Sequence, residues 1–299
     1  MSSLGDLFHA LPAVHCLREQ LPATIDWVVH DIYADLAHCF TDVDRVIRFP
    51  RSSLLTGFPS LHAELRARPY DLIIDMQGLM KSALVGRLAK RARFIGPSFQ
   101  REGARRLYDE VAGTLNKDRH AVDECLDVVR HLKLDASTVK FPVAFHPLAV
   151  ERSKKRVAML PCSRRLEKNW TVRGFVEVGQ ALAEAGAEVV LVGGNADRET
   201  CAQIVAGIGG TATNLAGTTG LVELGGLLQT MALMVTVDSG PMHMAAAMGV
   251  PVVAIFGPTF PERTGPYGDG HRVIKQGQDL SQLSAAPVVN AALEMLETS

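Results

Sequence analysis

Short apolar runs alternate with longer amphipathic stretches along almost the whole chain. The short runs are rich in β-branched residues and end in small polar clusters, which is typical of strands buried in a parallel sheet. The longer stretches repeat apolar residues at helical spacing, which predicts helices that cover the sheet. The predicted strands are 25–29, 45–48, 71–75, 93–95, 157–160, 188–194, 211–215, 234–238, 250–257 and 271–275, and the predicted helices are 5–20, 31–38, 59–67, 79–90, 118–133, 171–185, 196–207, 220–231, 240–248 and 284–298.

The alternation is interrupted near the middle of the chain, at residues 141–155 (FPVAFHPLAVERSKK), where two prolines precede a basic run. This break predicts two α/β domains, an N-terminal one over 1–148 and a C-terminal one over 149–299, with the last helix able to pack back on the N-terminal domain. Residues 97–117 show no clean period and are predicted to form a long loop. Two such domains suggest a cleft, and ligands of open α/β sheets bind beyond the carboxyl ends of the strands.

Composition narrows the class of protein. Lys and Arg number 31 against 32 for Asp and Glu, and the resulting net charge of −1 does not favour a nucleic-acid partner. Five unclustered cysteines without a CxxC motif predict reduced thiols rather than disulfides or a zinc site. No apolar run reaches the ~18 residues of a membrane-spanning helix, and a cytoplasmic location is expected, with a membrane-surface location left open. The absence of HExxH, GxSxG and GxxxxGK[ST] motifs argues against zincins, common serine hydrolases and P-loop NTPases.

The strand predicted over 234–238 leads directly into a helix through Asp238, Ser239 and Gly240. The free backbone N–H groups of a helix start, together with the Ser239 hydroxyl, suit phosphate oxygens, and Asp238 suits a sugar hydroxyl. A simple helix cap explains the same residues. His243, one turn into this apolar helix, is more typical of a packed core histidine than of a ligand-binding one.

Two other strand ends in the C-terminal half carry polar groups. Gly257, Pro258 and Thr259 follow the next strand, where a glycine permits close approach of a ligand and Thr259 offers a hydroxyl; a plain turn is the alternative. The glycines at 193–194 end another strand and precede Asp197 and Glu199, and a carboxylate near such a strand end suits ribose hydroxyls.

The first strand of the C-terminal half is followed by LPCSRRLEKNW at 160–170. Ser163, Arg164, Arg165 and Lys168 place a hydroxyl and three cations at a strand end before a helix, which suits a diphosphate. A solvated cationic turn is the alternative interpretation.

The N-terminal half offers a carboxylate and a group of cations. Asp6 lies in an SLGD turn that enters the first helix, where it would serve as a general base or as a helix cap. Lys81 follows another predicted strand end, and with Arg101, Arg105 and Arg106 it forms a candidate patch for an acidic acceptor. Exposed lysines and arginines on a solvated surface are the alternative.

Six segments, in this order and spacing, resemble the lipopolysaccharide heptosyltransferases, glycosyltransferase family 9, most closely the heptosyltransferase I branch. They are SSLGDLFHALPA at 2–13, YDLIIDMQGLMKSAL at 70–84, HAVDECLDVVRHL at 120–132, SRRLEKNW at 163–170, VTVDSGPMHMAAAMGVPVVAIFGPT at 235–259 and GPYG at 265–268.

The resemblance implies a GT-B fold, in which two Rossmann-like domains face each other across a cleft. It implies transfer of L-glycero-D-manno-heptose from ADP-heptose to the Kdo sugar of lipid A, with inversion and without a metal or other cofactor. The expected location is cytoplasmic, with peripheral contact at the cytoplasmic face of the inner membrane, and no nucleic acid is expected as a partner.

The resemblance also implies roles for residues that match the family's motifs. Asp6 matches a proposed general base, and Ser163 and Lys168 match contacts to the phosphates and sugar of the donor, with Lys168 offsetting charge on the departing ADP. The loop 238–240 matches the segment that grips the diphosphate and heptose, and Arg101 matches a cation that faces the phosphorylated acceptor. The remaining candidates are Arg164, Glu199, His243, Gly257 and Thr259 on the donor side and Lys81 on the acceptor side.

Three departures from the family pattern stand out. Arg164 replaces the second of two hydroxyl residues, and the donor-side carboxylate falls on Arg198 or Glu199 depending on the alignment gap. The family has a strand of about eight residues before SSLGD. The sequence is therefore expected to be a shortened form, in which two strands of the N-terminal sheet have unpaired edges.

Two other functions fit the pattern. One is a GT-B enzyme that uses another nucleotide sugar, including a nucleotide-sugar epimerase of similar architecture. The other is a non-catalytic homologue that binds a nucleotide sugar without turning it over.

Overall fold

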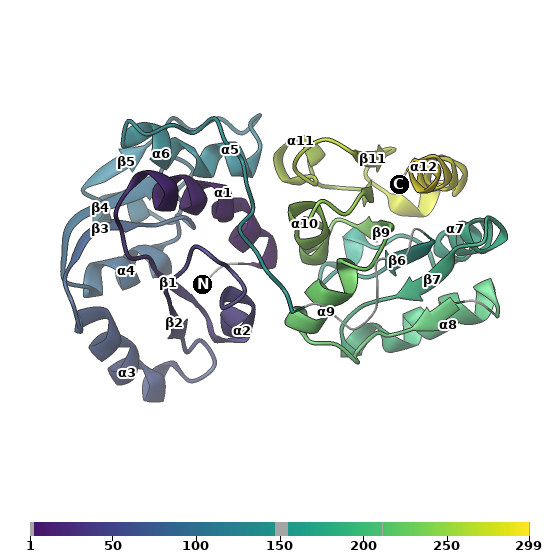
Figure 1. The fold of residues 1–299 in the computed structure, drawn as a ribbon, viewed down its shortest axis with the longest axis horizontal. Coiled ribbons are helices and arrows are strands. Elements are labelled where there is room, and N and C mark those ends of the chain that lie inside the picture. The colour runs from purple at the N-terminus through teal and green to yellow at the C-terminus, as the bar shows by residue number, and fades with distance from the viewer. Residues whose placement is uncertain (1–2, 147–154, 211, 299) are drawn as a thin grey trace. The chain divides into compact units, whose positions relative to one another are not determined.

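The chain forms two compact units in the computed structural model (Figure 1). The N-terminal unit covers 1–144 and the C-terminal unit covers 145–299. The boundary expected between residues 148 and 149 lies outside the described residues, which are 3–146, 155–210 and 212–298. Both units are α/β with parallel strands, as the alternating pattern predicts.

The N-terminal unit opens with a helix whose start is fixed by its own sequence. Helix α1 (Leu4–Gln20) begins in a capping box, in which the Ser3 hydroxyl accepts from the Asp6 N–H and the Asp6 carboxylate accepts from the Ser3 N–H. The helix is buried along most of its length and packs mainly on α5. The elements that follow are β1 (Asp26–His30), α2 (Ala34–Ala37), β2 (Arg45–Phe49), α3 (Leu54–Arg66), β3 (Tyr70–Ile74), α4 (Met80–Leu88), β4 (Arg91–Pro97), β5 (Glu110–Ala112), α5 (Ala121–Cys125) and α6 (Asp127–His131).

The strands of this unit form two separate parallel sheets. Strand β1 pairs with β2, and β4 lies between β3 and β5. Within residues 3–146 no backbone ladder joins the two sheets, so β1 and β3 each pair on one side only. The expectation of a shortened form stays a prediction.

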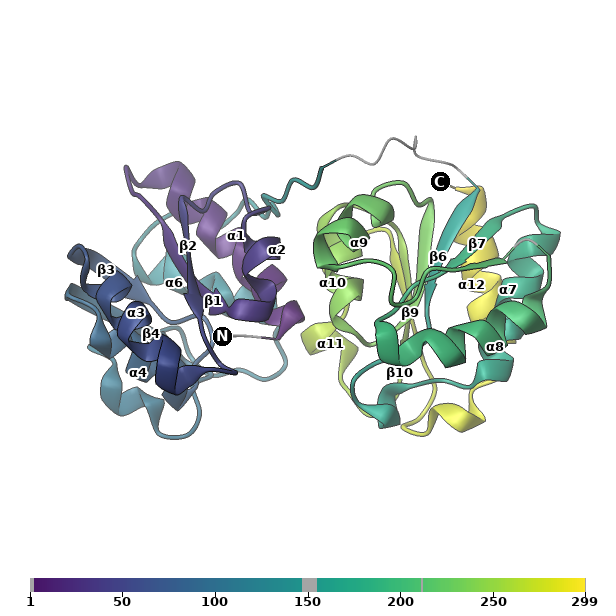
Figure 2. The same ribbon diagram turned by 90° about the horizontal axis from the view of Figure 1, so that it is seen from below.

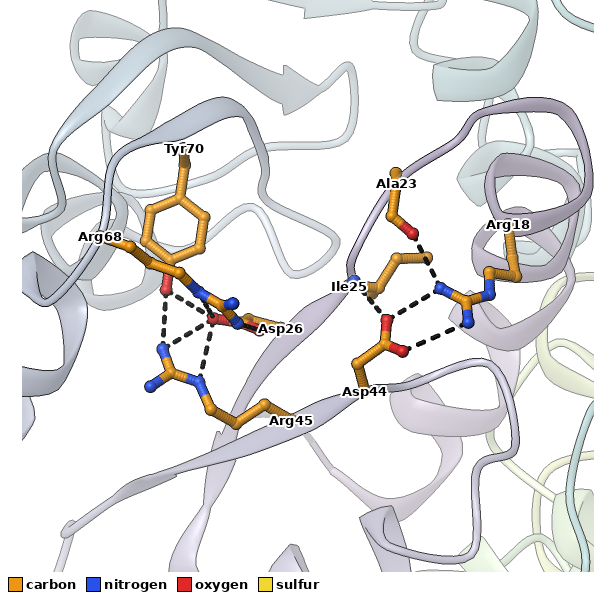
Figure 3. A network of polar contacts seen from close by, with 8 residues as sticks. All are labelled: Arg18, Ala23, Ile25, Asp26, Asp44, Arg45, Arg68 and Tyr70. Atoms are coloured by element: carbon orange, nitrogen blue, oxygen red, sulfur yellow. Dashed lines mark hydrogen bonds and ion pairs between the residues drawn. The ribbon is translucent and has the colours of Figure 1, made fainter.

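Side chains connect the two sheets where backbone pairing does not (Figure 3). The Asp26 carboxylate of β1 accepts hydrogen bonds from Tyr70 Oη of β3 at 2.7 Å, from Arg45 Nη2 at 2.7 Å and from Arg68. Burial alone would raise the pKa of Asp26, but the hydrogen bonds from Tyr70, Arg45 and Arg68 outweigh it and lower the pKa. We call these four residues the Asp26 cluster.

The C-terminal unit contains one six-stranded parallel sheet with the order β11-β10-β9-β6-β7-β8. Its strands are β6 (Arg156–Leu160), β7 (Glu188–Leu191), β8 (Ala212–Asn214), β9 (Leu233–Val237), β10 (Val252–Phe256) and β11 (His271–Lys275), and its helices are α7 (Val172–Glu184), α8 (Arg198–Ile208), α9 (Leu221–Leu228), α10 (Gly240–Ala247), α11 (Pro261–Thr264) and α12 (Ala286–Glu297).

Helices cover both faces of this sheet, with α9 and α10 on one face and α7 and α12 on the other (Figure 2). Every residue of β9 and β10 is buried, which explains why their sequences are continuous apolar runs rather than alternating ones. Strands β6 and β9 are neighbours, and the chain order reverses between them. The sheet therefore has its topological switch point beside β6 and β9, where ligands of such sheets bind. The expected return of the last helix to the N-terminal domain stays a prediction.

Three predicted elements of the N-terminal half need correction. The loop expected over 97–117 contains a 3-10 turn at Ala104–Leu107 and strand β5, whose residue Glu110 pairs with Ile95 of β4. A three-residue strand has too few positions to show a period. The helix expected over 118–133 is divided into α5 and α6 at Leu126, and the helix expected over 31–38 begins as a 3-10 turn before α2. Among the described residues, no helix combines the length and apolar character needed to cross a membrane.

Candidate active site

Three segments that are distant in sequence meet at the carboxyl ends of β6, β9 and β10. Lys168 Nζ lies 2.6 Å from Oδ2 of Asp238, and Thr259 Oγ1 donates to the same oxygen at 2.7 Å. The Asp238 side chain is 6% exposed and that of Lys168 is 16% exposed, so the ion pair is largely shielded from water. We call Lys168, Asp238, Ser239 and Thr259 the Asp238 cluster.

Helix α10 begins at this cluster without the usual side-chain cap. Ser239 occupies the N-cap position with an extended backbone, yet its hydroxyl makes no capping hydrogen bond in the described structure and lies 3.1 Å from Thr236 Oγ1. The first N–H groups of a helix lack intrahelical partners, and the helix dipole makes this end attractive to anions. The start of α10 offers the N–H groups of Gly240 and Met242, since Pro241 has none, and it thus has the features of an anion site. His243 is buried within the same helix.

The turn after β6 is ordered by its own polar groups. Asn169 Oδ1 accepts from the Ser163 N–H at 2.7 Å, and the Ser163 hydroxyl accepts from the Arg165 N–H at 3.2 Å. The Arg165 guanidinium pairs with Glu167 at 2.6 Å. Among the cations expected to suit a diphosphate, Lys168 joins the Asp238 cluster through its ion pair with Asp238. Arg164 is exposed on this turn.

The segment after β10 is held by groups that the sequence pattern did not reveal. Lys275 Nζ at the end of β11 donates to the Thr259 carbonyl oxygen at 2.5 Å and lies 5.0 Å from the centre of the Phe260 ring. A Cβ at Gly257 would come within 3.0 Å of the Gln278 carbonyl oxygen. The glycine therefore permits close packing of the protein's own chain, and its role toward a ligand stays a prediction.

The Gly-rich end of β7 has a local structural explanation as well. Asp197 Oδ2 accepts from the Gly194 N–H at 2.7 Å and fixes the turn into α8. Glu199 is exposed in the first turn of α8, and its Oε1 lies 3.2 Å from Gln203 Nε2 on the same helix. Among the described residues, Glu199 makes no hydrogen bond to the Asp238 cluster, so its donor role stays a prediction.

In the N-terminal unit, the candidate base Asp6 is part of the helix cap. Its Oδ2 accepts from the Ser3 N–H at 2.9 Å, which is the capping interpretation of the SLGD turn. Asp6 also lies close enough to Cys125 of α5 to affect its ionisation: burial is the main cause that raises the pKa of Cys125, and the charge of Asp6 adds to it. A capping carboxylate retains further lone pairs, so the cap and a catalytic role do not exclude each other.

The segments that carry Lys81 and Arg101 are bound to each other. The Arg101 N–H donates to the Gly78 carbonyl oxygen at 2.7 Å, and the Met80 N–H donates to Glu102 Oε2 at 3.1 Å. Gly78 has a φ of 70° and would clash with the Gln100 backbone if it carried a Cβ. We call residues 76–82, which run into the first turn of α4, and residues 98–103 the paired loops; Lys81 and Arg101 are exposed on them.

The paired loops rest on a carboxylate that the sequence analysis missed. Asp75 follows β3, is buried, and accepts hydrogen bonds from two backbone N–H groups and two hydroxyls. One of the hydroxyls belongs to Tyr108, which lies beyond Arg101 in the sequence. An aspartate after a strand is an ordinary turn residue, so the sequence carries no signal that distinguishes this one.

Comparison with known proteins agrees with this architecture. Residues 59–286 match the model of glycosyltransferase family 9 (heptosyltransferase). The chain is 30% identical over 294 residues to lipopolysaccharide heptosyltransferase 1 of Pseudomonas aeruginosa, covering 89% of this chain and 79% of that protein. It is 26% identical over 300 residues to the lipopolysaccharide core heptosyltransferase OpsX of Haemophilus influenzae, covering 94% of this chain and 84% of that protein.

The solved structure of the E. coli heptosyltransferase WaaC with ADP is similar over nearly the whole chain. Its TM-score is 0.88 at 26% identity, and the alignment covers 99% of this chain and 98% of that one. The protein has the GT-B fold and is a glycosyltransferase. The family match spans more than half of the chain, and it confirms the resemblance that the six sequence segments indicate. The chain belongs to glycosyltransferase family 9, the heptosyltransferases of lipopolysaccharide core synthesis.

Proposed function

We propose that this protein transfers L-glycero-D-manno-heptose from ADP-heptose to a Kdo hydroxyl of lipid A, with inversion at the anomeric carbon. The observation that carries the proposal is the convergence of Lys168 and Thr259 on Asp238 beside the uncapped start of α10. No metal and no resident cofactor is required, because the charge that develops on the leaving diphosphate meets a lysine and backbone N–H groups.

The donor side is assigned to the Asp238 cluster. The diphosphate lies against the first N–H groups of α10, with the hydroxyls of Ser239 and Ser163 as further donors. Lys168 is held in place by Asp238, and its ammonium charge offsets the negative charge that develops on the diphosphate as the bond to the sugar breaks. The solved structures of E. coli WaaC include complexes with ADP and with ADP-2-deoxy-2-fluoro heptose, which supports a nucleotide-sugar site in this fold.

The acceptor side is assigned to the N-terminal unit. Asp6 removes the proton from the attacking Kdo hydroxyl, whose oxygen forms a bond to the anomeric carbon while the bond from that carbon to the diphosphate oxygen breaks. Both electrons of that bond leave with ADP. Lys81 and Arg101 bind the anionic groups of the phosphorylated, Kdo-bearing acceptor.

The location that fits this reaction is the cytoplasm, with peripheral contact at the inner membrane surface where the lipid acceptor resides. The paired loops present exposed cations, which suits an anionic lipid acceptor.

The test is the reaction itself with purified protein. ADP-heptose and Kdo-lipid A are supplied, and mass spectrometry is expected to show an acceptor heavier by one heptose together with released ADP. A product that carries a different sugar from a panel of nucleotide sugars would identify another GT-B activity. An altered donor sugar without acceptor would identify an epimerase. Binding of ADP without any turnover would identify a non-catalytic homologue.

A further inference from the structure

Four hydrogen-bond donors from three places in the chain converge on Asp75. Its Oδ1 accepts from the Gln77 N–H at 2.8 Å and the Gly78 N–H at 3.1 Å. Its Oδ2 accepts from Ser82 Oγ at 2.7 Å and from Tyr108 Oη at 2.8 Å. The residue is 6% exposed, so this carboxylate depends on its donors rather than on water. The network closes the turn that connects β3 to α4.

Tyr108 joins this turn to strand β4, which leads directly into the second of the paired loops. Its ring is buried, stands perpendicular to Phe94 with centroids 5.1 Å apart, and packs so closely on Gly96 that a Cβ there would clash. Burial and the adjacent Asp75 charge raise the pKa of Tyr108, so its hydroxyl stays a hydrogen-bond donor. The tyrosine is thus fixed at its ring by β4 and at its hydroxyl by Asp75.

Lys81 and Arg101 lie on the two segments that this network joins. Lys81 is one residue before Ser82, which Asp75 binds. Arg101 is attached through its N–H to the carbonyl of Gly78, whose own N–H is bound by Asp75. The relative position of the two cations therefore depends on a carboxylate that touches neither of them.

We propose that Asp75, together with Tyr108, is a positioning residue that presets Lys81 and Arg101 for the anionic groups of the acceptor. The inference rests on the acceptor role given to these cations in the proposed function. Fixing the backbone positions that carry the two cations before the anion arrives lowers the conformational entropy lost on binding, and this raises affinity for the acceptor without altering the donor site.

The test compares two tyrosine variants with the same chemical change. Tyr108→Phe removes a hydroxyl that donates to Asp75, and Tyr70→Phe removes a hydroxyl that donates to the buried Asp26 at 2.7 Å in the same unit. Tyr70 lies in the Asp26 cluster, away from the paired loops. Both variants are expected to lower the midpoint of thermal unfolding by a similar amount.

The two variants are expected to differ in transfer kinetics. Tyr108→Phe raises the KM for Kdo-lipid A about fivefold, while the KM for ADP-heptose and kcat stay within about twofold. Tyr70→Phe leaves all three constants within about twofold. Asp75→Asn, which keeps the shape of the side chain but replaces one acceptor oxygen by a donor, raises the acceptor KM in the same direction.

Two results overturn the inference. One is an unchanged acceptor KM in Tyr108→Phe despite a lowered unfolding midpoint, and the other is an equal rise in acceptor KM in Tyr70→Phe. Either result leaves the proposed function standing if the wild-type protein transfers heptose. If the wild-type protein transfers no heptose, binding of O-deacylated Kdo-lipid A is measured by calorimetry instead. Weaker binding by Tyr108→Phe than by Tyr70→Phe then supports the inference alone. Absence of binding to the wild-type protein overturns both proposals.

Discussion

Lys168 Nζ lies 2.6 Å from Asp238 Oδ2, although the two residues are 70 positions apart. Lys168 is in a 3-10 turn after β6, and Asp238 directly follows β9. Adjacent parallel strands bring these two ends together at the switch point of the sheet. The pair holds a lysine at the start of a helix that is suited to anions, and this relationship supports the donor-site proposal.

Removal of the lysine tests that relationship. Lys168→Met is expected to weaken ADP binding at least about tenfold, equivalent to about 1.4 kcal/mol, because the diphosphate loses its closest cation. It is also expected to lower the free energy of unfolding, since Asp238 is left buried without its counter-ion. Calorimetric titration with ADP and denaturant unfolding measure the two effects.

Arg165→Met is the matched control on the same turn, because its guanidinium is already paired with Glu167. Its ADP affinity is expected to stay within about twofold of wild type. Equal losses of ADP affinity in Lys168→Met and Arg165→Met would mean that the turn binds ADP only through its overall charge.

Removal of the Thr259 hydroxyl tests whether its hydrogen bond to Asp238 serves ADP binding or only the stability of the fold. Thr259→Val deletes the donor 2.7 Å from Asp238 Oδ2 and is expected to lower the free energy of unfolding by about 1 kcal/mol and to weaken ADP binding several-fold. Thr230→Val deletes a hydroxyl that donates to the Leu227 carbonyl at 2.8 Å in the same unit. It should destabilise the protein similarly and leave ADP binding unchanged. Weaker binding in both variants would contradict a specific role for Thr259.

Substitution of each residue of the α1 capping box distinguishes a capping role of Asp6 from a role as the general base. Asp6→Asn keeps a side-chain oxygen for the Ser3 N–H but cannot take a proton, so transfer is expected to be abolished while ADP binding persists. Ser3→Ala removes the reciprocal bond to the Asp6 N–H and is expected to cost about 1 kcal/mol of stability while transfer continues. Radiolabelled heptose transfer and thermal unfolding provide the readouts. Undiminished transfer by Asp6→Asn would exclude Asp6 as the base.

Acid sensitivity is predicted from the Asp26 cluster. Because the pKa of Asp26 is lower in the folded than in the unfolded protein, its carboxylate stabilises the fold at neutral pH. That contribution is lost as the pH falls below the ordinary carboxyl pKa and through the lowered one. Asp26→Asn should therefore show a smaller decrease in unfolding midpoint between about pH 5 and pH 3 than the wild-type protein.

Asp35→Asn is the control for this experiment, since its carboxylate is 80% exposed and pairs with an exposed Arg48. Its unfolding midpoint should follow the wild-type dependence on pH. If the unfolding midpoint of Asp26→Asn falls with pH as steeply as that of the wild-type protein, the Asp26 cluster does not contribute to acid sensitivity.

The alternation of apolar runs with helical stretches predicts most of the fold because buried parallel strands must be apolar on both faces. Strand β5 escaped prediction because its three residues owe their structure to pairing with β4, which is a tertiary contact. The break between α5 and α6 likewise could not be predicted, because both helices follow the same apolar spacing.

The candidate site was predicted as separate strand ends, and the sheet rule places those ends at one edge. The contacts among the polar side chains at these strand ends depend on side-chain geometry, which the spacing of residues in the sequence does not reveal. Lys168 and Thr259 share one oxygen of Asp238, whereas Glu199 bonds to Gln203 on its own helix. Asp75 and Lys275 were missed because a lone Asp or Lys at a strand end has no distinguishing pattern.

A crystal structure with bound ADP tests the donor-site assignment most directly. It is expected to place the diphosphate against the first N–H groups of α10, with an oxygen within hydrogen-bond distance of Lys168 Nζ. A nucleotide bound away from both Lys168 and the start of α10 would contradict it.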